Sequence, residues 1–165
     1  MANYKIKTDT GGCMFCDITK GKIKPLGDAL IWEDKKYMAW LSPFPNTKGF
    51  AMIIPKKHYA GDVLKMDDKA LVKFILAAKK VAKLLEDYFK DVGRVGLIME
   101  GTGIDHAHIK LVPMHGTRHM KKGIWKRYNS GKTDYFKKYV GYLSSADGPK
   151  ADLKRLKKLA EKIRG

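Results

Sequence analysis

The fold is organised around the stretch GTGIDHAHIKLVPMHG, residues 101–116. It opens on a short glycine turn and continues as a strand-like run over residues 105–112. Because side chains alternate between the two faces of a strand, one face carries a row of polar groups and the other is apolar. The polar face holds His106, His108 and Lys110, together with Val112. The apolar face, which we expect in the core, holds Ala107, Ile109 and Leu111.

Two imidazoles and one ammonium on the same face favour a functional site over a solvated strand surface. Histidine near neutral pH can act as a nucleophile, a proton shuttle or a metal ligand. An ammonium and the backbone N–H groups of a glycine turn both suit a phosphate group. We therefore expect a functional site at His106, His108 and Lys110.

Apolar runs bounded by turn residues predict four more strands. They cover residues 28–33, 36–41, 50–55 and 94–100. A short helical turn is predicted over residues 17–21, and one long helix over residues 68–90 with Asp67 as its N-cap. The buried stripe of the long helix should consist of Leu71, Phe74, Ile75, Ala78, Ala82, Leu85 and Phe89. These elements predict an α+β domain with a mostly antiparallel five-stranded sheet and one long helix.

The composition limits the class of protein. A chain of 165 residues, 44% of them hydrophobic, should form one domain with a substantial core. It has no run of about 18 apolar residues, so no membrane span is expected. Residues 1–12 lack an apolar signal core. We therefore expect a cytoplasmic protein, in which the two cysteines indicate metal or redox chemistry rather than a disulfide scaffold.

The net charge of +17 favours anionic partners such as nucleotides, nucleic acids or acidic surfaces. Residues 118–165 carry 15 lysines and arginines against 4 acidic residues, a net charge of +11. We expect a flexible arm over residues 1–12, a domain over residues 13–116, and a basic extension over residues 117–165. A basic amphipathic helix over residues 151–164 should pack on the domain through its apolar stripe. That stripe consists of Leu153, Leu156, Leu159 and Ile163.

The cations of the extension are interleaved with aromatic residues. One interpretation is an ordinary solvated surface. The other is a nucleic-acid-binding segment, because aromatic rings can stack on bases while the cations contact phosphates. The sequence leaves both interpretations open.

The motif Cys13-Met-Phe-Cys16 is a candidate metal site. A structural zinc ion needs four nitrogen or sulfur ligands, and because no second cysteine pair exists the remaining two must be histidines. His58 directly follows a predicted strand, and His106 opens the histidine pair, so the two can meet at one end of an antiparallel sheet. The candidate zinc ligands are therefore Cys13, Cys16, His58 and His106. The alternative is a reduced, unligated cysteine pair with His58 on the surface.

Together these motifs resemble the histidine triad (HIT) proteins. The resemblance rests on four segments in the same order. They are the Cys-x-x-Cys pair, a strand hairpin, the segment PNTKGFAMIIPKKH at residues 45–58, and the His-x-His pair before Leu-Val-Pro. The resemblance covers residues 13–116 and implies a five-stranded antiparallel sheet with a long helix, dimerised into a ten-stranded sheet. It also supports His106 as a zinc ligand.

HIT proteins bind nucleotides and cleave the bond at the α-phosphate. The middle histidine of the motif attacks phosphorus, and water then hydrolyses the nucleotidyl-histidine. By position this nucleophile is His108. The expected substrate is a dinucleoside polyphosphate or a nucleoside phosphoramidate, with adenine or another purine as the base. The resemblance also implies nucleotide-binding residues. We expect Ser42 and Asn46 at the sugar. At the phosphates we expect Thr102, Gly103 and Lys110.

Several positions depart from the family pattern. Lys110 stands at the third histidine of the triad, Phe50 at the histidine after the loop glycine, and Ser42 at the acidic residue that usually holds the ribose. The usual Gln-Ser/Thr segment before the motif is missing. A protonated lysine cannot accept a hydrogen bond, but it can stabilise charge on a phosphate and favour a neutral His108. His115 is either a substitute acid–base partner or a surface turn residue.

The sequence is consistent with three functions, which we rank from the most to the least favoured. The first is a hydrolase of HIT type that uses His108 and Lys110. The second is a catalytically weak nucleotide-binding module, in which turnover is lost with Phe50 and Lys110. The third is a nucleic-acid-binding HIT protein that uses its basic extension, and it is compatible with the first.

Overall fold

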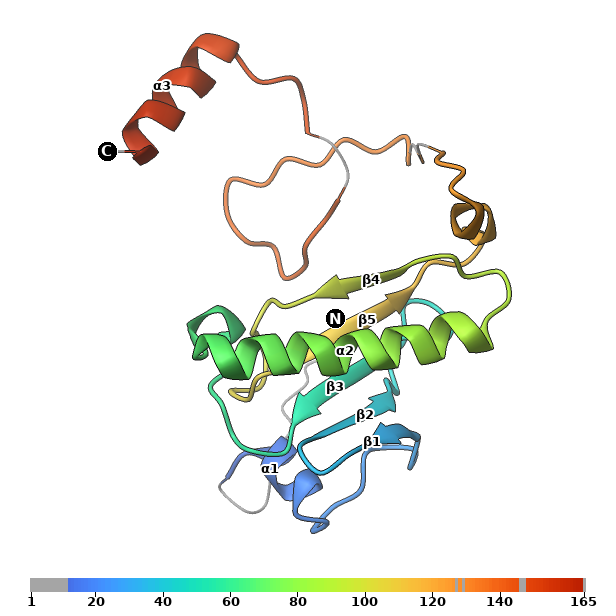
Figure 1. Ribbon diagram of the computed structural model, residues 1–165. Helices are drawn as coiled ribbons and strands as arrows, with labels where there is room; N and C mark the ends of the chain where they lie inside the picture. Colours follow the sequence, from blue (N-terminus) through green and yellow to red (C-terminus); the bar gives the residue numbers. More distant parts are fainter. Residues whose placement is uncertain (1–11, 127, 129, 146–147, 165) are drawn as a thin grey trace. The chain divides into compact units, whose positions relative to one another are not determined.

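The computed structural model describes residues 12–126, 128, 130–145 and 148–164. It divides into two compact units, Met1–Trp125 and Lys126–Gly165 (Figure 1). All but Gly12 of the expected N-terminal arm lies outside the described residues. None of the described helices combines the length and the apolar character needed to cross a membrane.

The first unit is built on one antiparallel sheet, which confirms the predicted α+β class. Within the described residues the sheet has five strands in the order β1-β2-β3-β5-β4, and every neighbouring pair is antiparallel. The strands are β1 (Leu30–Glu33), β2 (Tyr37–Leu41), β3 (Ala51–Pro55), β4 (Val95–Ile98) and β5 (Ile109–Pro113). A tight turn joins β1 and β2, where the Asp34 carboxylate accepts hydrogen bonds from the backbone N–H groups of Lys36 and Tyr37.

The long helix α2 (Asp68–Tyr88) crosses one face of this sheet (Figure 1). Asp67 caps it as predicted, because its carboxylate accepts a hydrogen bond from the N–H of Ala70 at 2.9 Å. Its buried residues are Phe74, Ala77, Ala78, Val81 and Leu85. The predicted stripe members Leu71, Ile75, Ala82 and Phe89 are only partly buried beside this core.

The short helix α1 (Met14–Thr19) contributes to a second hydrophobic cluster. This cluster consists of Phe15 and Ile18 from α1 with the sheet residues Met38, Trp40 and Ile54. Residues adjacent in β2 and β3, such as Ala39 and Ile53, belong instead to the core under α2. Since alternate strand residues face opposite sides, α1 and α2 lie on opposite faces of the sheet. The turn predicted over residues 17–21 begins three residues earlier, at Met14, with Cys13 as N-cap.

The stretch at residues 101–116 differs from a continuous strand. β5 begins only at Ile109, whereas we expected a strand from Asp105. The preceding bend brings Gly101 against the backbone of Gly61. Gly101 has a φ of 63°, and a Cβ built on it would lie 2.7 Å from the carbonyl oxygen of Gly61, so only glycine fits there.

Both sides of this stretch are buried. The predicted core residues Ala107, Ile109 and Leu111 are fully buried, as expected. His106 is also fully buried and His108 is 3% exposed, so the histidine face is not a solvated strand surface.

The remaining helices are η1 (Val63–Lys65), η2 (Arg118–Lys122) and, in the second unit, α3 (Leu153–Arg164). The described part of the second unit before α3 is irregular, and the rings of Phe136 and Tyr142 lie edge to face within it, 5.5 Å apart. The packing of the terminal helix on the domain stays a prediction.

Candidate functional site

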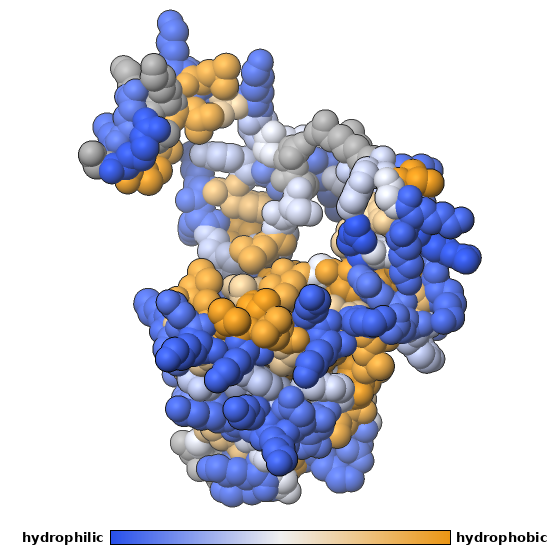
Figure 2. Space-filling model, viewed as in Figure 1, coloured by the Kyte–Doolittle hydropathy of each residue, from blue (hydrophilic) through white to orange (hydrophobic). Residues whose placement is uncertain are grey.

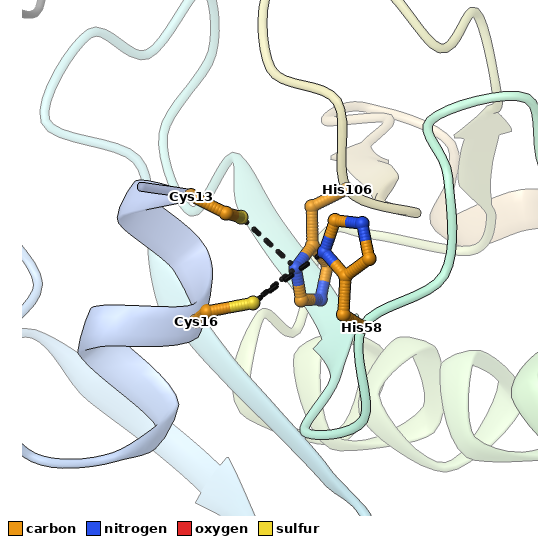
Figure 3. A group of neighbouring side chains, drawn as sticks. All are labelled: Cys13, Cys16, His58 and His106. Atoms are coloured by element: carbon orange, nitrogen blue, oxygen red, sulfur yellow. Dashed lines mark hydrogen bonds between the residues drawn. The ribbon is translucent and has the colours of Figure 1, made fainter. Parts of the chain in front are cut away.

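Three segments that are distant in sequence bring two thiols and two imidazoles together (Figure 3). Cys13 is the N-cap of α1 and Cys16 lies in its first turn, so both side chains leave the same end of the helix. His58 comes from the segment that follows β3, and His106 from the bend that precedes β5. The structure therefore places all four predicted metal ligands in one cluster.

The distances in this cluster suit a metal ion. The Sγ of Cys13 lies 3.3 Å from the Nδ1 of His106, and the Sγ of Cys16 lies 3.5 Å from the same nitrogen. The Sγ of Cys16 is also 3.4 Å from the Nδ1 of His58. One donor atom from each residue falls within 4.8 Å of all the others. These four residues are close enough to bind one ion.

The orientation of His106 leaves the correct nitrogen free. Its Nε2 donates a hydrogen bond to the carbonyl oxygen of Pro55 at 2.9 Å, so Nδ1 carries the lone pair in the neutral ring. Ligating histidines in proteins are commonly held by such a bond from the other nitrogen. Burial also lowers the pKa of His106, which favours the neutral imidazole that a metal requires.

Burial shifts the pKa of the Cys16 thiol upward, whereas it shifts the pKa of His106 downward. Burial and the neighbouring Cys13 thiol raise the pKa of Cys16, because both disfavour a thiolate. A bound cation would reverse this preference, since a coordinating thiol is deprotonated. Without a cation the raised pKa keeps Cys16 in the thiol form near neutral pH.

His108 stands beside this cluster with one defined tautomer. Its Nδ1 lies 2.8 Å from the carbonyl oxygen of His106. A carbonyl oxygen only accepts hydrogen bonds, so Nδ1 carries the proton and Nε2 holds the lone pair of the neutral ring. The ring packs edge to face on Phe15, with centroids 5.9 Å apart. His108 is thus a buried imidazole with its Nε2 available for chemistry.

Phe15 links the two histidines, and sequence reasoning missed it. Its ring also packs edge to face on His106 and on Trp40, at centroid distances of 5.7 and 5.5 Å. The signal was present, because Phe15 is an apolar residue inside the Cys-x-x-Cys motif. If the cysteine–histidine cluster holds α1 on the sheet, Phe15 on that helix would also hold the His108 ring in place.

Lys110 forms an ion pair with Glu100, which is the second residue that sequence reasoning missed. The side chains are 26% and 10% exposed. Glu100 lies two residues beyond the end of β4 at Ile98, and the strand register that pairs Ile98 with Lys110 makes the contact possible. Burial lowers the pKa of Lys110. Lys110 is therefore a partly buried, paired cation.

The predicted nucleotide-binding residues other than Lys110 lie in two separate loops. Thr102 and Gly103 are exposed in the turn between β4 and the histidine bend. Ser42 and Asn46 lie in the loop between β2 and β3, at the opposite end of β3 from His58. The Ser42 hydroxyl accepts a hydrogen bond from the N–H of Phe44 at 3.2 Å, and Asn46 is exposed.

His115 has a structural role at the far end of β5. Its Nδ1 lies 2.9 Å from a carboxylate oxygen of Asp91, and its Nε2 lies 2.9 Å from the carbonyl oxygen of Lys48. Both ring nitrogens face acceptors, and these contacts raise the pKa of His115, with the Lys48 carbonyl contributing most. The whole of β5 separates it from His108. His115 thus ties a loop to the end of the sheet, which supports the surface-turn alternative.

Comparison with known proteins identifies the family. Residues 25–117 match the family profile described as the HIT domain. A HIT-like protein from Mycoplasma genitalium is 35% identical over 132 residues, which cover 78% of this chain and 87% of that protein. An adenosine 5'-monophosphoramidase from Saccharomyces cerevisiae is 31% identical over 126 residues, 76% of this chain and 75% of that protein.

The fold is also similar to that of a solved structure. A crystal structure from Streptococcus mutans superposes with a TM-score of 0.62 at 24% identity, and it covers 96% of this chain and 87% of that one. The sequence match spans more than half of the chain and includes both histidines of the His-x-His pair. The chain belongs to the HIT family.

Proposed function

We propose that this protein is a nucleotide hydrolase that cleaves at the α-phosphate through a covalent nucleotidyl-His108. The observation that carries the proposal is the hydrogen bond from Nδ1 of His108 to the carbonyl of His106, which places the lone pair of the neutral ring on Nε2. The relative from Saccharomyces cerevisiae that is named an adenosine 5'-monophosphoramidase supports a nucleoside phosphoramidate as the substrate class. A dinucleoside polyphosphate presents the same α-phosphate and is the second substrate to test.

The proposed reaction has two displacements at phosphorus. First, the lone pair of His108 Nε2 forms a bond to the α-phosphorus, and the bond from phosphorus to the leaving nitrogen or oxygen breaks. The leaving group takes a proton from solvent. Then water attacks the same phosphorus and releases one proton to solvent, the bond between phosphorus and Nε2 breaks, and the nucleoside monophosphate leaves with neutral His108 restored. The protein supplies the nucleophile, and water supplies the oxygen of the product.

Lys110 is the group that we assign to charge stabilisation. Its ammonium, held by Glu100, would face the non-bridging oxygens, where negative charge develops during both displacements. Thr102 and Gly103 would offer a hydroxyl and backbone N–H groups to the phosphates. Ser42 and Asn46 would contact the sugar from the loop between β2 and β3.

We also propose that the cysteine–histidine cluster binds structural zinc. A tetrahedral zinc ion with bonds of about 2.3 Å to sulfur and 2.0–2.1 Å to nitrogen would place sulfur and nitrogen ligands about 3.6 Å apart. The distances of 3.3–3.5 Å in the cluster fit this value. When bound, zinc would supply a cross-link between α1 and the sheet. The four ligands would be Cys13, Cys16, His58 and His106. They would complete the tetrahedral coordination and leave no position on the metal for water or substrate.

A homodimer is a further part of the proposal. β4 lies at one edge of the sheet, and Leu97 on this strand is 42% exposed. An edge strand carries unpaired backbone groups that a second copy of β4 could pair. Light scattering after size-exclusion chromatography should give twice the monomer mass. Substitution of Leu97 by lysine should shift the protein toward the monomer, and a monomeric wild type would refute this part.

The decisive experiment mixes the full-length protein with adenosine phosphoramidate or a diadenosine polyphosphate and follows AMP release. Turnover that is lost in His108→Ala would support the hydrolase. The matched control is His119→Ala, which changes a histidine outside the histidine motif. Equal release by wild type and His108→Ala would overturn the proposal.

The second candidate is a binding module without turnover, favoured by the ion pair that engages Lys110 where a third histidine is expected. Its mark would be nucleotide binding by calorimetry with no AMP release from either substrate.

A further inference from the structure

A second polar surface lies on the face of the sheet opposite His108. Two adjoining cavities of about 400 and 540 Å³ lie along the side of α2 next to the β1–β2 hairpin, and they share Lys36, Tyr37 and Lys73. Among the residues that the structure describes, nine lysines line them. We call this continuous feature the basic groove. Figure 2 shows hydrophilic side chains gathered over this part of the molecule.

The positive charge of the basic groove is largely uncompensated. Only Lys56 and Lys83 form ion pairs, with Glu33 and Asp87, and the other seven lysines make none with any residue of the described chain. Asp34 and Asp67 also line the groove, and their carboxylates keep their charge while they accept hydrogen bonds from backbone N–H groups, so two acidic residues stand against nine lysines in the lining. The N-terminal end of α2, a helix of 21 residues, opens into the same cavity and adds partial positive charge.

Three lysines of α2 form a row along one side of the helix. Lys69, Lys73 and Lys80, all exposed, fall at the spacing that places side chains on one side of a helix. They extend over 11 residues, which is about 16 Å along the axis. Leu76 lies in the same row and is 51% exposed, so an apolar contact is available between the cations. Tyr59, under the ammonium of Lys57, also lines the groove.

This arrangement differs from the nucleotide site. His108 faces the α1 side of the sheet, since it contacts Phe15, whereas the basic groove is on the α2 side. A single mononucleotide at His108 cannot reach both faces of a packed sheet. A row of ammonium groups over about 16 Å instead matches a polymer that carries one phosphate per repeat. The two cavities, of about 400 and 540 Å³, fall in the size range of pockets that hold small ligands, which is the scale of individual nucleotides rather than of a duplex.

We propose that the basic groove binds a single strand of nucleic acid through its phosphates. The exposed Leu76 and the ring of Tyr59 would contact bases or sugars without reading the sequence. This form of binding combines a charged groove with apolar contacts and is strongly salt-dependent. The basic C-terminal extension is not required for it.

The test measures binding of the full-length protein to fluorescent 20-nucleotide oligo-dT and oligo-U by anisotropy at several salt concentrations. The groove variant is Lys69→Glu/Lys73→Glu/Lys80→Glu. The matched control, Lys150→Glu/Lys154→Glu/Lys162→Glu, makes the same change of charge in the second unit. A second groove variant with glutamine at the three positions removes the charge with less risk to folding, and thermal melting checks all variants.

We expect the groove variant to bind the oligonucleotides about 10- to 100-fold more weakly than the control variant. The slope of log K against log salt should fall by about 2, because three phosphate contacts are lost at about 0.7 each. AMP release should be unchanged in both variants. Equal losses in groove and control variants would overturn the proposal. So would inorganic polyphosphate or a duplex of the same length that binds while neither single strand does.

Discussion

The Nδ1 of His108 donates its proton to the carbonyl oxygen of His106, 2.8 Å away, so a candidate metal ligand and the candidate nucleophile share one piece of backbone. The side chain of His106 contacts the sulfur of Cys13 through Nδ1 and the carbonyl oxygen of Pro55 through Nε2. A shift of the cluster would therefore move the carbonyl that sets the tautomer of His108. The zinc proposal and the hydrolase proposal can be tested separately, but their outcomes should be coupled.

The first prediction concerns the covalent intermediate. If Nε2 of His108 attacks phosphorus, rapid alkaline quenching during turnover of adenosine phosphoramidate should trap one adenylyl group on the protein. Mass spectrometry should locate it on the peptide that contains His108. The adduct should be stable to base and labile to acid, because it is a phosphoramidate. An adduct on another residue, or rapid turnover without any adduct in wild type, would contradict the mechanism.

Substitution of Lys110 tests its role in charge stabilisation. Lys110→Met keeps the length of the side chain and removes the charge, so kcat/KM should fall about 10- to 1000-fold. Lys110→His restores the histidine that the family has at this position and should retain more activity than Lys110→Met. Equal activity of wild type and Lys110→Met would assign Lys110 a structural role only.

The zinc proposal predicts one zinc ion per chain by elemental analysis after purification without added metal. Cys16→Ser should reduce the content below about a tenth of an equivalent and lower the melting temperature, because α1 loses its cross-link to the sheet. Met14→Leu, a change in the same helix at a residue outside the ligand set, should keep the ion. A full equivalent of zinc in Cys16→Ser would exclude the proposed ligand set.

The pair of His115 and Asp91 predicts a window of pH-dependent stability. The pKa of His115 is raised by the Lys48 carbonyl and by Asp91, so its contribution is complete below the unfolded pKa and is lost as the pH rises through the folded pKa. The pKa of Asp91 is lowered by the hydrogen bond with His115, so its contribution is lost as the pH falls below the unfolded pKa.

The pair should therefore stabilise the fold between about pH 4 and pH 6.5, the ordinary values for the two groups. The melting temperature of wild type minus that of Asp91→Asn should be largest in this window and should shrink above it and below it. Asp152→Asn, in the second unit, is the control that should show no such profile. A difference that is constant with pH would rule out the ion pair.

The two glycines before the histidine bend give a matched pair of variants. Gly101→Ala should lower the free energy of unfolding by about 2–4 kcal/mol, because strain at positive φ adds to a clash with Gly61. Gly103 also has a positive φ, but a Cβ there would meet nothing within 4 Å, so Gly103→Ala should cost only about 1 kcal/mol. Urea denaturation measures both. A cost for Gly103→Ala as large as that for Gly101→Ala would show that the contact with Gly61 is unimportant.

The sequence by itself determined the elements of the first unit and predicted the four residues that the structure brings together as a candidate metal site. Apolar runs between turn residues, the alternation along the histidine stretch and the Asp67 cap are local signals, and they located the strands and the long helix to within about four residues. The choice among cysteines and histidines was also constrained locally, since a chain with two cysteines needs histidines to complete a site.

Only the tertiary structure decided how the groups are paired. The contacts of Glu100 with Lys110, of His108 with the His106 carbonyl, and of Phe15 with both histidines join residues on different elements or depend on a bend that interrupts the predicted strand. The basic groove likewise exists because the helix α2 packs beside a hairpin with its own lysines. The periodicity of apolar and polar residues in the sequence predicts which face of its own helix or strand a side chain lies on. Which side chain meets it from another element depends on strand order and helix packing, and those follow from burial of the whole core.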